Sequence, residues 1–530
     1  MDGRPVQVGG PRLSLFSKKK RALCAVAVAG MVLAGCATLE EITLVERSAT
    51  AQEDIALALA PQEPVGGPVS LYTAMARALK YNLDSRVELM REHFASGDYT
   101  LAKFDLLPSS DVNGGYEGRS NTQASSSESI LTRAESLEPS TSLQNNRAVG
   151  TISTVWSALD FGASYLRLRQ KKNQLFIAHE SRRKTVNSLT REVRRAYWRL
   201  AAANAVGGEL VNLRAAASRG IRRARQAEAE GLESAEASVE FERRMLRIIK
   251  AITVRQRDLA IARTELATLM GIDPSQNYQI TRPRFSEHKT PGVEHRVSDL
   301  RSIALINRPE LYEADYKARI ASLEKSIDII TALPSIQANL DLNADSNGFL
   351  VNQFWVEYGA KVVGSIPRLL SLPTRIKRGD ARNALVEEQR RAITMAVISQ
   401  VHIAHQVYHD KQREFRLAQR LTNAERRNYR IQQDKERSSL ANESAFLEAR
   451  AQYLQARLDS YFAFAELQEA YARVLESVGI DFVKVDFGDG TVSSVSNELR
   501  AFFSGSSNKP LKHYWQEARE IERQAIQAGA

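Results

Sequence analysis

The sequence is poor in the residues that break helices or cross-link chains. Only 15 of its 530 residues are proline and only two are cysteine, and no proline occurs in residues 140–273 or 374–509. Because a proline inside a helix removes a hydrogen bond and clashes with the preceding turn, both long stretches are predicted to be helical. A composition with 43% hydrophobic and 25% charged residues excludes wholesale disorder and a collagen-like fibre.

The chain also lacks a block of positive charge beyond its first 35 residues. Six basic residues and one aspartate in that segment supply +5 of the formal net charge of +11, which leaves +6 for the rest. Elsewhere Lys and Arg alternate with Glu and Asp, as on the solvated faces of helices. The charge pattern therefore argues against nucleic acid as a partner.

The N-terminal segment has the pattern of a secretory signal. A basic cluster that ends at Arg21 precedes an apolar run, Ala22 to Ala34, which is too short to span a bilayer as a mature helix. The run closes with Leu33-Ala34-Gly35-Cys36, which resembles the lipobox of bacterial lipoproteins, where the cysteine is acylated after cleavage. The alternative is an ordinary signal peptide with a chance cysteine. Cys24 would be discarded with the signal, so the mature chain could form no internal disulfide.

The remainder of the chain is duplicated. Residues 78–109 align without a gap on residues 304–335 at an offset of 226, and Gly271-Ile272-Asp273 corresponds to Gly479-Ile480-Asp481 at an offset of 208. Landmarks in the same order indicate an internal repeat. The predicted organisation is a signal peptide (1–35), a linker after the lipidated cysteine (36–68), a first repeat (69–270), a linker (271–296), a second repeat (297–481) and an unassigned tail (482–530).

Each repeat contains a long helical pattern. From Val186 to Leu210 the apolar or small residues recur at alternating steps of three and four, which is a heptad seam. A helix from about Ala163 to Glu230 would be about 100 Å long at about 1.5 Å per residue. Such a rod must pack laterally on other rods, so each repeat is predicted to contribute a long antiparallel coiled-coil hairpin.

Each Leu-Pro-Ser turn is followed by alternation with period two. Strands are predicted at about residues 110–119, 147–158, 335–344 and 354–364, apolar on one face and hydrophilic on the other. Two architectures need strands with one apolar and one hydrophilic face. One is a membrane barrel with a water-filled interior, and the other is a soluble sandwich with one solvated face. The secretory signal, and the lack of an 18-residue apolar helix in the mature chain, favour the barrel.

Four strands cannot close a barrel around water. An open sheet edge inside lipid would leave backbone hydrogen bonds unmade, so several chains must contribute strands to one barrel. Long rods attached to such a barrel would form a helical tube on the same axis. This geometry predicts a conduit.

The ordered motifs resemble those of the TolC-like outer-membrane efflux proteins, in their lipoprotein branch, over about residues 69–482. The residues that carry the resemblance are Leu71 through Leu79 with Asn82, Ala304-Leu305 with Arg308-Pro309-Glu310-Leu311, both Leu-Pro-Ser turns, Trp156 through Gly162, Ala196-Tyr197-Trp198, Gly231-Leu232 and Leu266 through Pro274.

The resemblance implies a mainly α fold with a small β membrane part. Three chains would form a homotrimer with a twelve-stranded β-barrel, four strands from each, continuous with an α-helical tunnel in the periplasm. Such a protein, lipid-anchored in the outer membrane, passively conducts substrates from a periplasmic membrane-fusion adaptor and an inner-membrane pump of the resistance-nodulation-division or ABC type, or serves a type I secretion system. It is not an enzyme and needs no cofactor.

The resemblance also implies that the tips of the helical hairpins contact the adaptor. The first tip is expected at Gly231 and Leu232, where a glycine can end a long helix in a left-handed conformation. Ser439 and Leu440 occupy the matching place in the second repeat, where the glycine is missing.

Two glutamates are candidates for the periplasmic aperture. Glu448 aligns with one of the aspartates that ring the closed end in some members, and Glu240 is its counterpart in the first repeat. Three copies of a carboxylate around a narrow opening would attract cations by focusing the field. The alternative is that each is an exposed glutamate paired with Arg243 or Arg450 on its own helix.

Other sequence features give weaker indications of function. His402, His405 and His409 share one stripe of a helix and could in principle hold zinc, but the stripe is the polar face and only Asp410 lies among them, so solvent-facing histidines are predicted and no metal. The chain has no phosphate-binding loop or nucleophile elbow. The competing function is a non-conducting structural envelope lipoprotein with coiled-coil rods, which does not need alternating strands in both repeats.

Overall fold

The computed structural model describes residues 41–59, 62–136, 138–281, 292–438, 443–481, 490–503 and 509–527. The chain divides into a unit of residues 1–61 and a unit of residues 62–530. In the first unit the described residues form helix α2 (Leu44–Ala58), which begins with a capping box between Thr43 and Glu46 and buries no side chain. The segment expected to be a linker therefore contains a helix. Cys36 and the predicted signal peptide lie outside the described residues.

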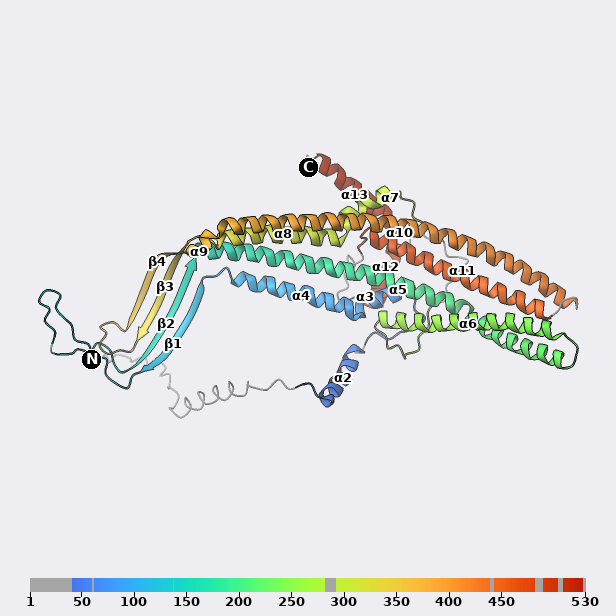
Figure 1. The fold of residues 1–530 in the computed structure, drawn as a ribbon, viewed down its shortest axis with the longest axis horizontal. Helices are drawn as coiled ribbons and strands as arrows, with labels where there is room; N and C mark the ends of the chain where they lie inside the picture. The colour runs from blue at the N-terminus through green and yellow to red at the C-terminus, as the bar shows by residue number, and fades with distance from the viewer. Residues whose placement is uncertain are drawn as a thin grey trace, which may run out of the picture. The chain divides into compact units, whose positions relative to one another are not determined.

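The described residues of the larger unit are mainly helical and include four strands, which Figure 1 labels. The predicted combination of long helices with a small β part is therefore confirmed for this unit. Its elements are, in order, α3 (Leu71–Tyr81), α4 (Leu83–Phe104), β1 (Ser109–Gly118), β2 (Asn146–Ser157), α5 (Ala158–Ala229), α6 (Ala235–Leu269), α7 (Val297–Asn307), α8 (Pro309–Ile330), β3 (Ser335–Asp345), β4 (Phe354–Val363), α9 (Ile366–Leu370), α10 (Leu372–Arg437), α11 (Glu443–Ser477), α12 (Val492–Phe503) and α13 (Lys509–Gln527).

Two helices, α5 with 72 residues and α10 with 66, are the longest elements. Ser157 caps α5 by accepting a hydrogen bond from the backbone of Asp160, and the predicted heptad seam is buried along it, with Val193 and Ala196 fully covered. Helix α5 packs against α4, α6, α8 and α11, while α10 packs against α7, α8 and α11. The long rod predicted from the heptad spacing is confirmed, and it packs laterally.

The main core is shared by both repeats. Trp198 of α5 meets Phe464 of α11 edge-on, with 5.1 Å between ring centroids, and Phe415 of α10 contacts the same ring at 5.3 Å. Further along the helices, a smaller cluster joins Phe241 and Met245 of α6 to Leu447 of α11. Apolar contacts of this kind fix the four long helices against one another.

Both repeats end their last helix in the same way. The backbone of Gly271 has φ +72° and that of Gly479 φ +75°, and the residue after each glycine donates to a carbonyl five positions back. This is the Schellman end of a helix, which requires a left-handed residue. Each glycine also lies against the corner that precedes α4 or α8, where an added Cβ would approach Tyr81 to 3.0 Å or Asn307 to 2.8 Å.

The four strands form one antiparallel sheet in the order β1-β2-β3-β4. The central pair, β2 and β3, comes from different repeats, and its register places Thr154 opposite Leu340. The sheet therefore joins the repeats, and β1 and β4 are its edges.

The tail after residue 481, unassigned from the sequence, contains two helices in its described part. Helix α12 packs on α3 through Val495 and Leu499, and α13 packs on α7 through Leu511 and Tyr514, all of them buried. Within the described residues, no helix combines the length and the hydropathy that a membrane crossing requires.

Candidate functional site

The sheet has one apolar and one polar face, and its apolar face is exposed. Val112, Ile152, Leu342 and Val356 lie side by side across the four strands, and their exposed fractions range from 44 to 78%. Along β3 the even-numbered residues from 336 to 342 are exposed and the odd-numbered ones are partly buried. A water-soluble sheet would show the opposite arrangement, because apolar surface is normally removed from water.

The polar face is held together by side-chain hydrogen bonds. Asp341 accepts from Asn339 at 2.8 Å and also from Ser153 on the neighbouring strand. Thr151 donates to Asn343 at 3.0 Å. These contacts satisfy polar groups within β3 and between β2 and β3, so this face is suited to water and the other to an apolar medium.

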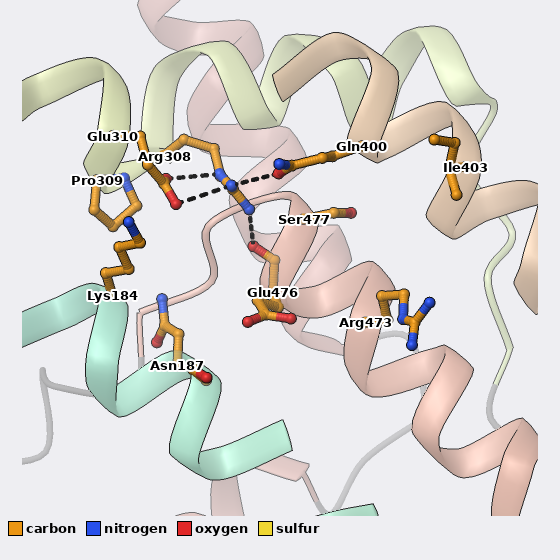
Figure 2. A pocket seen from close by; sticks show the side chains of 11 residues that line it. Lys184, Asn187, Arg308, Pro309, Glu310, Gln400, Ile403, Arg473, Glu476 and Ser477 are labelled. Atoms are coloured by element: carbon orange, nitrogen blue, oxygen red, sulfur yellow. Dashed lines mark hydrogen bonds and ion pairs between the residues drawn. The ribbon is translucent and has the colours of Figure 1, made fainter. Parts of the chain in front are cut away.

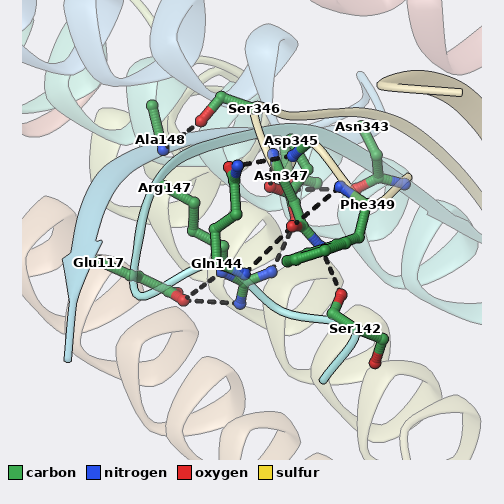
Figure 3. A network of polar contacts seen from close by, with 12 residues as sticks. Glu117, Ser142, Gln144, Arg147, Ala148, Asn343, Asp345, Ser346, Asn347 and Phe349 are labelled. Atoms are coloured by element: carbon green, nitrogen blue, oxygen red, sulfur yellow. Dashed lines mark hydrogen bonds and ion pairs between the residues drawn. The ribbon is translucent and has the colours of Figure 1, made fainter. Parts of the chain in front are cut away.

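A polar network closes the loop end of the sheet (Figure 3). Arg147 donates to Glu117 and to Asp345, each at 2.6 Å. The amide of Asn347, in the loop after β3, donates to the carbonyl of Ser142 in the loop after β1, at 2.9 Å. Since Asn347 is fully buried, this network fixes the two loops to each other.

The first hairpin tip lies where the sequence places it. Helix α5 ends at residue 229 and α6 begins at residue 235. Gly231 has φ +71°, and its backbone and that of Leu232 donate to Glu228 and Ala227, so the left-handed helix end expected there is present. Leu232 is 77% exposed, which leaves a large apolar side chain at the tip. At the second tip, Ser439 and Leu440 lie outside the described residues.

The structure brings Glu240 and Glu448 together through a cation that the sequence reading missed. Arg244 of α6 lies 3.6 Å from Glu240 and 3.4 Å from Glu448 of α11, and Arg243 lies 3.0 Å from Glu240. Pairing of Glu240 with Arg243 agrees with the alternative left open above. The partner of Glu448, however, comes from a neighbouring helix and not from Arg450 on its own. The i,i+4 spacing of Glu240 and Arg244 could have indicated their pairing from the sequence. The contact of Arg244 with Glu448 depends on how α6 and α11 pack.

A cavity of about 390 Å³ lies between α5, α8, α10 and α11 (Figure 2). Arg308 is buried at its wall and donates to the carbonyl of Glu476 at 2.9 Å and to Gln400 at 2.7 Å, and its Nε lies 2.9 Å from Glu310. Burial raises the pKa of the Glu476 carboxyl, although Arg191 lies 2.8 Å away. These hydrogen bonds and ion pairs connect the helices around the cavity.

The described residues contain no group of three or more His, Cys, Asp or Glu side chains that could hold a metal ion. Two histidines of the polar stripe do meet: the Nε2 atoms of His405 and His409 lie 3.1 Å apart. The prediction that these histidines simply face solvent is therefore incomplete, since both are half-buried.

Solved structures with a similar fold are outer-membrane channels. The channel OprN superimposes with a TM-score of 0.61 at 16% identity, covering 77% of this chain and 89% of that one. For the CmeC channel of Campylobacter jejuni the TM-score is 0.61 at 14% identity, with 84% and 89% covered. For the open state of the MtrE channel of Neisseria gonorrhoeae it is 0.60 at 14% identity, with 77% and 88% covered.

No protein-family model and no curated protein sequence matches the chain. At such low identities the structural similarity establishes the fold alone. That fold is the one the resemblance implied, with long helices and four strands in a single antiparallel sheet.

Proposed function

We propose that this chain, which has the fold of TolC-like outer-membrane channels, is itself the outer-membrane channel of a tripartite efflux or type I secretion system. It conducts substrates passively, without catalysis, from a periplasmic adaptor and an inner-membrane pump to the exterior. The structural neighbours support this proposal because they are described as outer-membrane channels.

The two-faced sheet carries the proposal. Its exposed apolar face suits lipid, and its hydrogen-bonded polar face suits a water-filled interior. A single chain leaves the edges of β1 and β4 open, and lipid cannot satisfy their backbone groups. Pairing of β4 with β1 of the next chain removes both edges, and three chains give a twelve-stranded barrel above a helical tunnel.

The hairpin tips are the surface we assign to the adaptor. Leu232 projects from the Schellman turn at Gly231, and Ser439 and Leu440 occupy the corresponding place in the second repeat. An exposed leucine on a hydrogen-bonded turn offers an apolar anchor for a partner helix. We also assign Glu240 and Glu448, which lie near the beginnings of α6 and α11, to the periplasmic end of the tunnel.

Attachment of lipid at Cys36 is the second membrane contact in this proposal. Since no other cysteine remains in the mature chain, labelling with a radioactive fatty acid should disappear in Cys36→Ser. Persistent label in that variant would refute acylation at this residue. Insertion of channels should partly survive the change, because the barrel itself has membrane affinity.

Conductance of the purified oligomer tests the function. The detergent-extracted protein should have the mass of a trimer, show an axial opening in projection images and produce discrete current steps in a planar bilayer. The same preparation from cells that lack the gene is the matched control. An oligomer with a closed axis and no current steps would instead support the structural envelope lipoprotein.

A further inference from the structure

Two imidazoles on α10 lie within hydrogen-bond distance of each other. The Nε2 atoms of His405 and His409 are 3.1 Å apart, and their rings meet at 71° with centroids 4.5 Å apart. His402, one turn earlier on the same stripe, is exposed. The stripe of three histidines in the sequence is thus a close pair and a separate third residue in the structure.

The helix beneath the pair is held in place. Val401, Ala404 and Tyr408 are buried on the adjoining face of α10, and the ring of Tyr408 contacts that of His409 at 5.3 Å. Since α10 is continuous through this region, the four-residue spacing of His405 and His409 keeps both side chains on one face. Little side-chain movement is needed for the two nitrogens to share a ligand.

The separation of the two nitrogens fits a shared metal ion. With metal–nitrogen bonds of about 2.0–2.1 Å, two imidazole nitrogens lie about 2.9 Å apart at a right angle and about 3.3 Å apart at a tetrahedral angle. The observed 3.1 Å falls between these values. Both rings are half-buried, so they remain open on one side to an incoming ion.

We propose that His405 and His409 form a two-imidazole site for one divalent transition-metal ion of the copper, nickel and zinc group. Imidazole suits these metals, whereas calcium and magnesium prefer oxygen ligands. Asp410 forms an ion pair with Arg413. Lys411 forms ion pairs with Glu414 and Glu466. These nearby carboxylates are therefore already paired with cations. Water therefore completes the coordination.

The site belongs to the second repeat alone. At the offset of 208 residues, His405 aligns with Tyr197 and His409 with Ala201, both of which are buried in the core. The duplication therefore does not account for the histidine pair. The proposal is also independent of channel function, because it requires only that α10 is folded and packed on its neighbouring helices.

Copper binding to the full-length, detergent-purified oligomer tests the site. The protein carries no histidine tag, and Cu²⁺ is added up to one equivalent per chain. Electron paramagnetic resonance should report one ion per chain with two nitrogen ligands, and competition should follow the order copper, nickel, zinc, with no displacement by Mg²⁺ or Ca²⁺.

Matched variants make the assignment specific. His405→Gln and His409→Gln keep the helix and a polar side chain, and each should weaken copper binding at least tenfold and remove the two-nitrogen signal. His402→Gln should leave both unchanged. Unaltered binding in His405→Gln and His409→Gln, an equal loss in His402→Gln, or the absence of binding by the native protein would overturn the proposal.

Discussion

The two repeats build the same corner with different side chains. In the first, Asn82 caps α4 and donates to the carbonyl of Leu269 at 3.4 Å. In the second, Arg308 occupies the aligned position and reaches the carbonyl of Glu476 at 2.9 Å and Gln400 at 2.7 Å. The duplicated architecture therefore fixes where the corner must bind the end of the last helix, while the chemistry of that contact has diverged.

The hairpin tips of the two repeats also differ in sequence. The first tip uses Gly231 to end α5 with a left-handed residue. The sequence of the second tip, at Ser439 and Leu440, has no glycine. A Cβ added at Gly231 would meet no neighbouring atom, whereas the glycines packed against a corner, Gly271 and Gly479, have no room for one and are present in both repeats.

Replacement of the corner residues should have the largest effect and should separate the repeats. Arg308→Met leaves Glu310 and Gln400 without their buried partner and should lower the free energy of unfolding by about 3–5 kcal/mol. Asn82→Ala removes a helix cap and should cost about 1 kcal/mol. Urea unfolding of the oligomer, followed by circular dichroism, measures both. Equal losses would mean that the two corners are energetically equivalent.

Substitutions on β3 should test the two faces of the sheet. Leu340→Arg places a charge on the apolar face and should cost about 2–4 kcal/mol if it lies near the bilayer midplane. Asn339→Arg, one position away on the polar face, should be tolerated because Asp341 lies within reach. Refolding into lipid vesicles gives the comparison, and equal sensitivity at both positions would contradict the assigned register.

Alanine at three left-handed glycines should rank by the space around each. Gly231→Ala meets no neighbouring atom and should cost only the left-handed strain of about 1–2 kcal/mol. Gly271→Ala should cost more and Gly479→Ala most, since an added Cβ there would lie 2.8 Å from the backbone of Asn307. Thermal denaturation of the three variants supplies the ranking. An equal loss of thermal stability in Gly231→Ala and Gly479→Ala would show that the corner at Gly479 can accommodate an added Cβ.

The carboxylates that we propose for the tunnel end should change conduction more than stability. In the proposed trimer, Glu240→Gln with Glu448→Gln would remove up to six carboxylates and should lower cation selectivity and block by multivalent cations. The partly exposed pairs with Arg244 contribute about 1 kcal/mol at most. Arg244→Gln should act in the opposite direction, because it leaves both carboxylates uncompensated. The test is planar-bilayer recording. If no variant alters ion selectivity, these residues lie on the outer surface of their helices and do not line the aperture.

Much of the fold was open to prediction because it rests on local periodicity. The heptad spacing around Val193 indicated a helix that runs from Ala158 to Ala229 in the structure, and alternation after each Leu-Pro-Ser turn indicated the strands. Gly231 could be placed at a helix end by its residue type. The helix in residues 44–58 and the helices of the tail were missed, since a polar segment or an isolated short helix gives little periodic signal.

The candidate site was predicted only in part. Glu240 and Glu448 were proposed as related carboxylates, but Arg244, which contacts both, was not identified. His405 and His409 were correctly placed on one stripe, and the four-residue spacing is visible in the sequence. That both rings are half-buried and touch depends on the packing of α10, so the spacing alone could not show it.

The sequence by itself determined the elements: long helices with no proline beyond the first turn, strands with one apolar face, and a duplication marked by the aligned glycines Gly271 and Gly479. Only the tertiary structure decided the partners across elements, such as Arg308 with Glu476, Arg147 with Asp345 and Arg244 with Glu448. Backbone hydrogen bonds and the side-chain period act over a few residues and are written locally. Contacts between elements depend on the rotation and stagger of one helix or strand against another, which are set by the packing of the whole core.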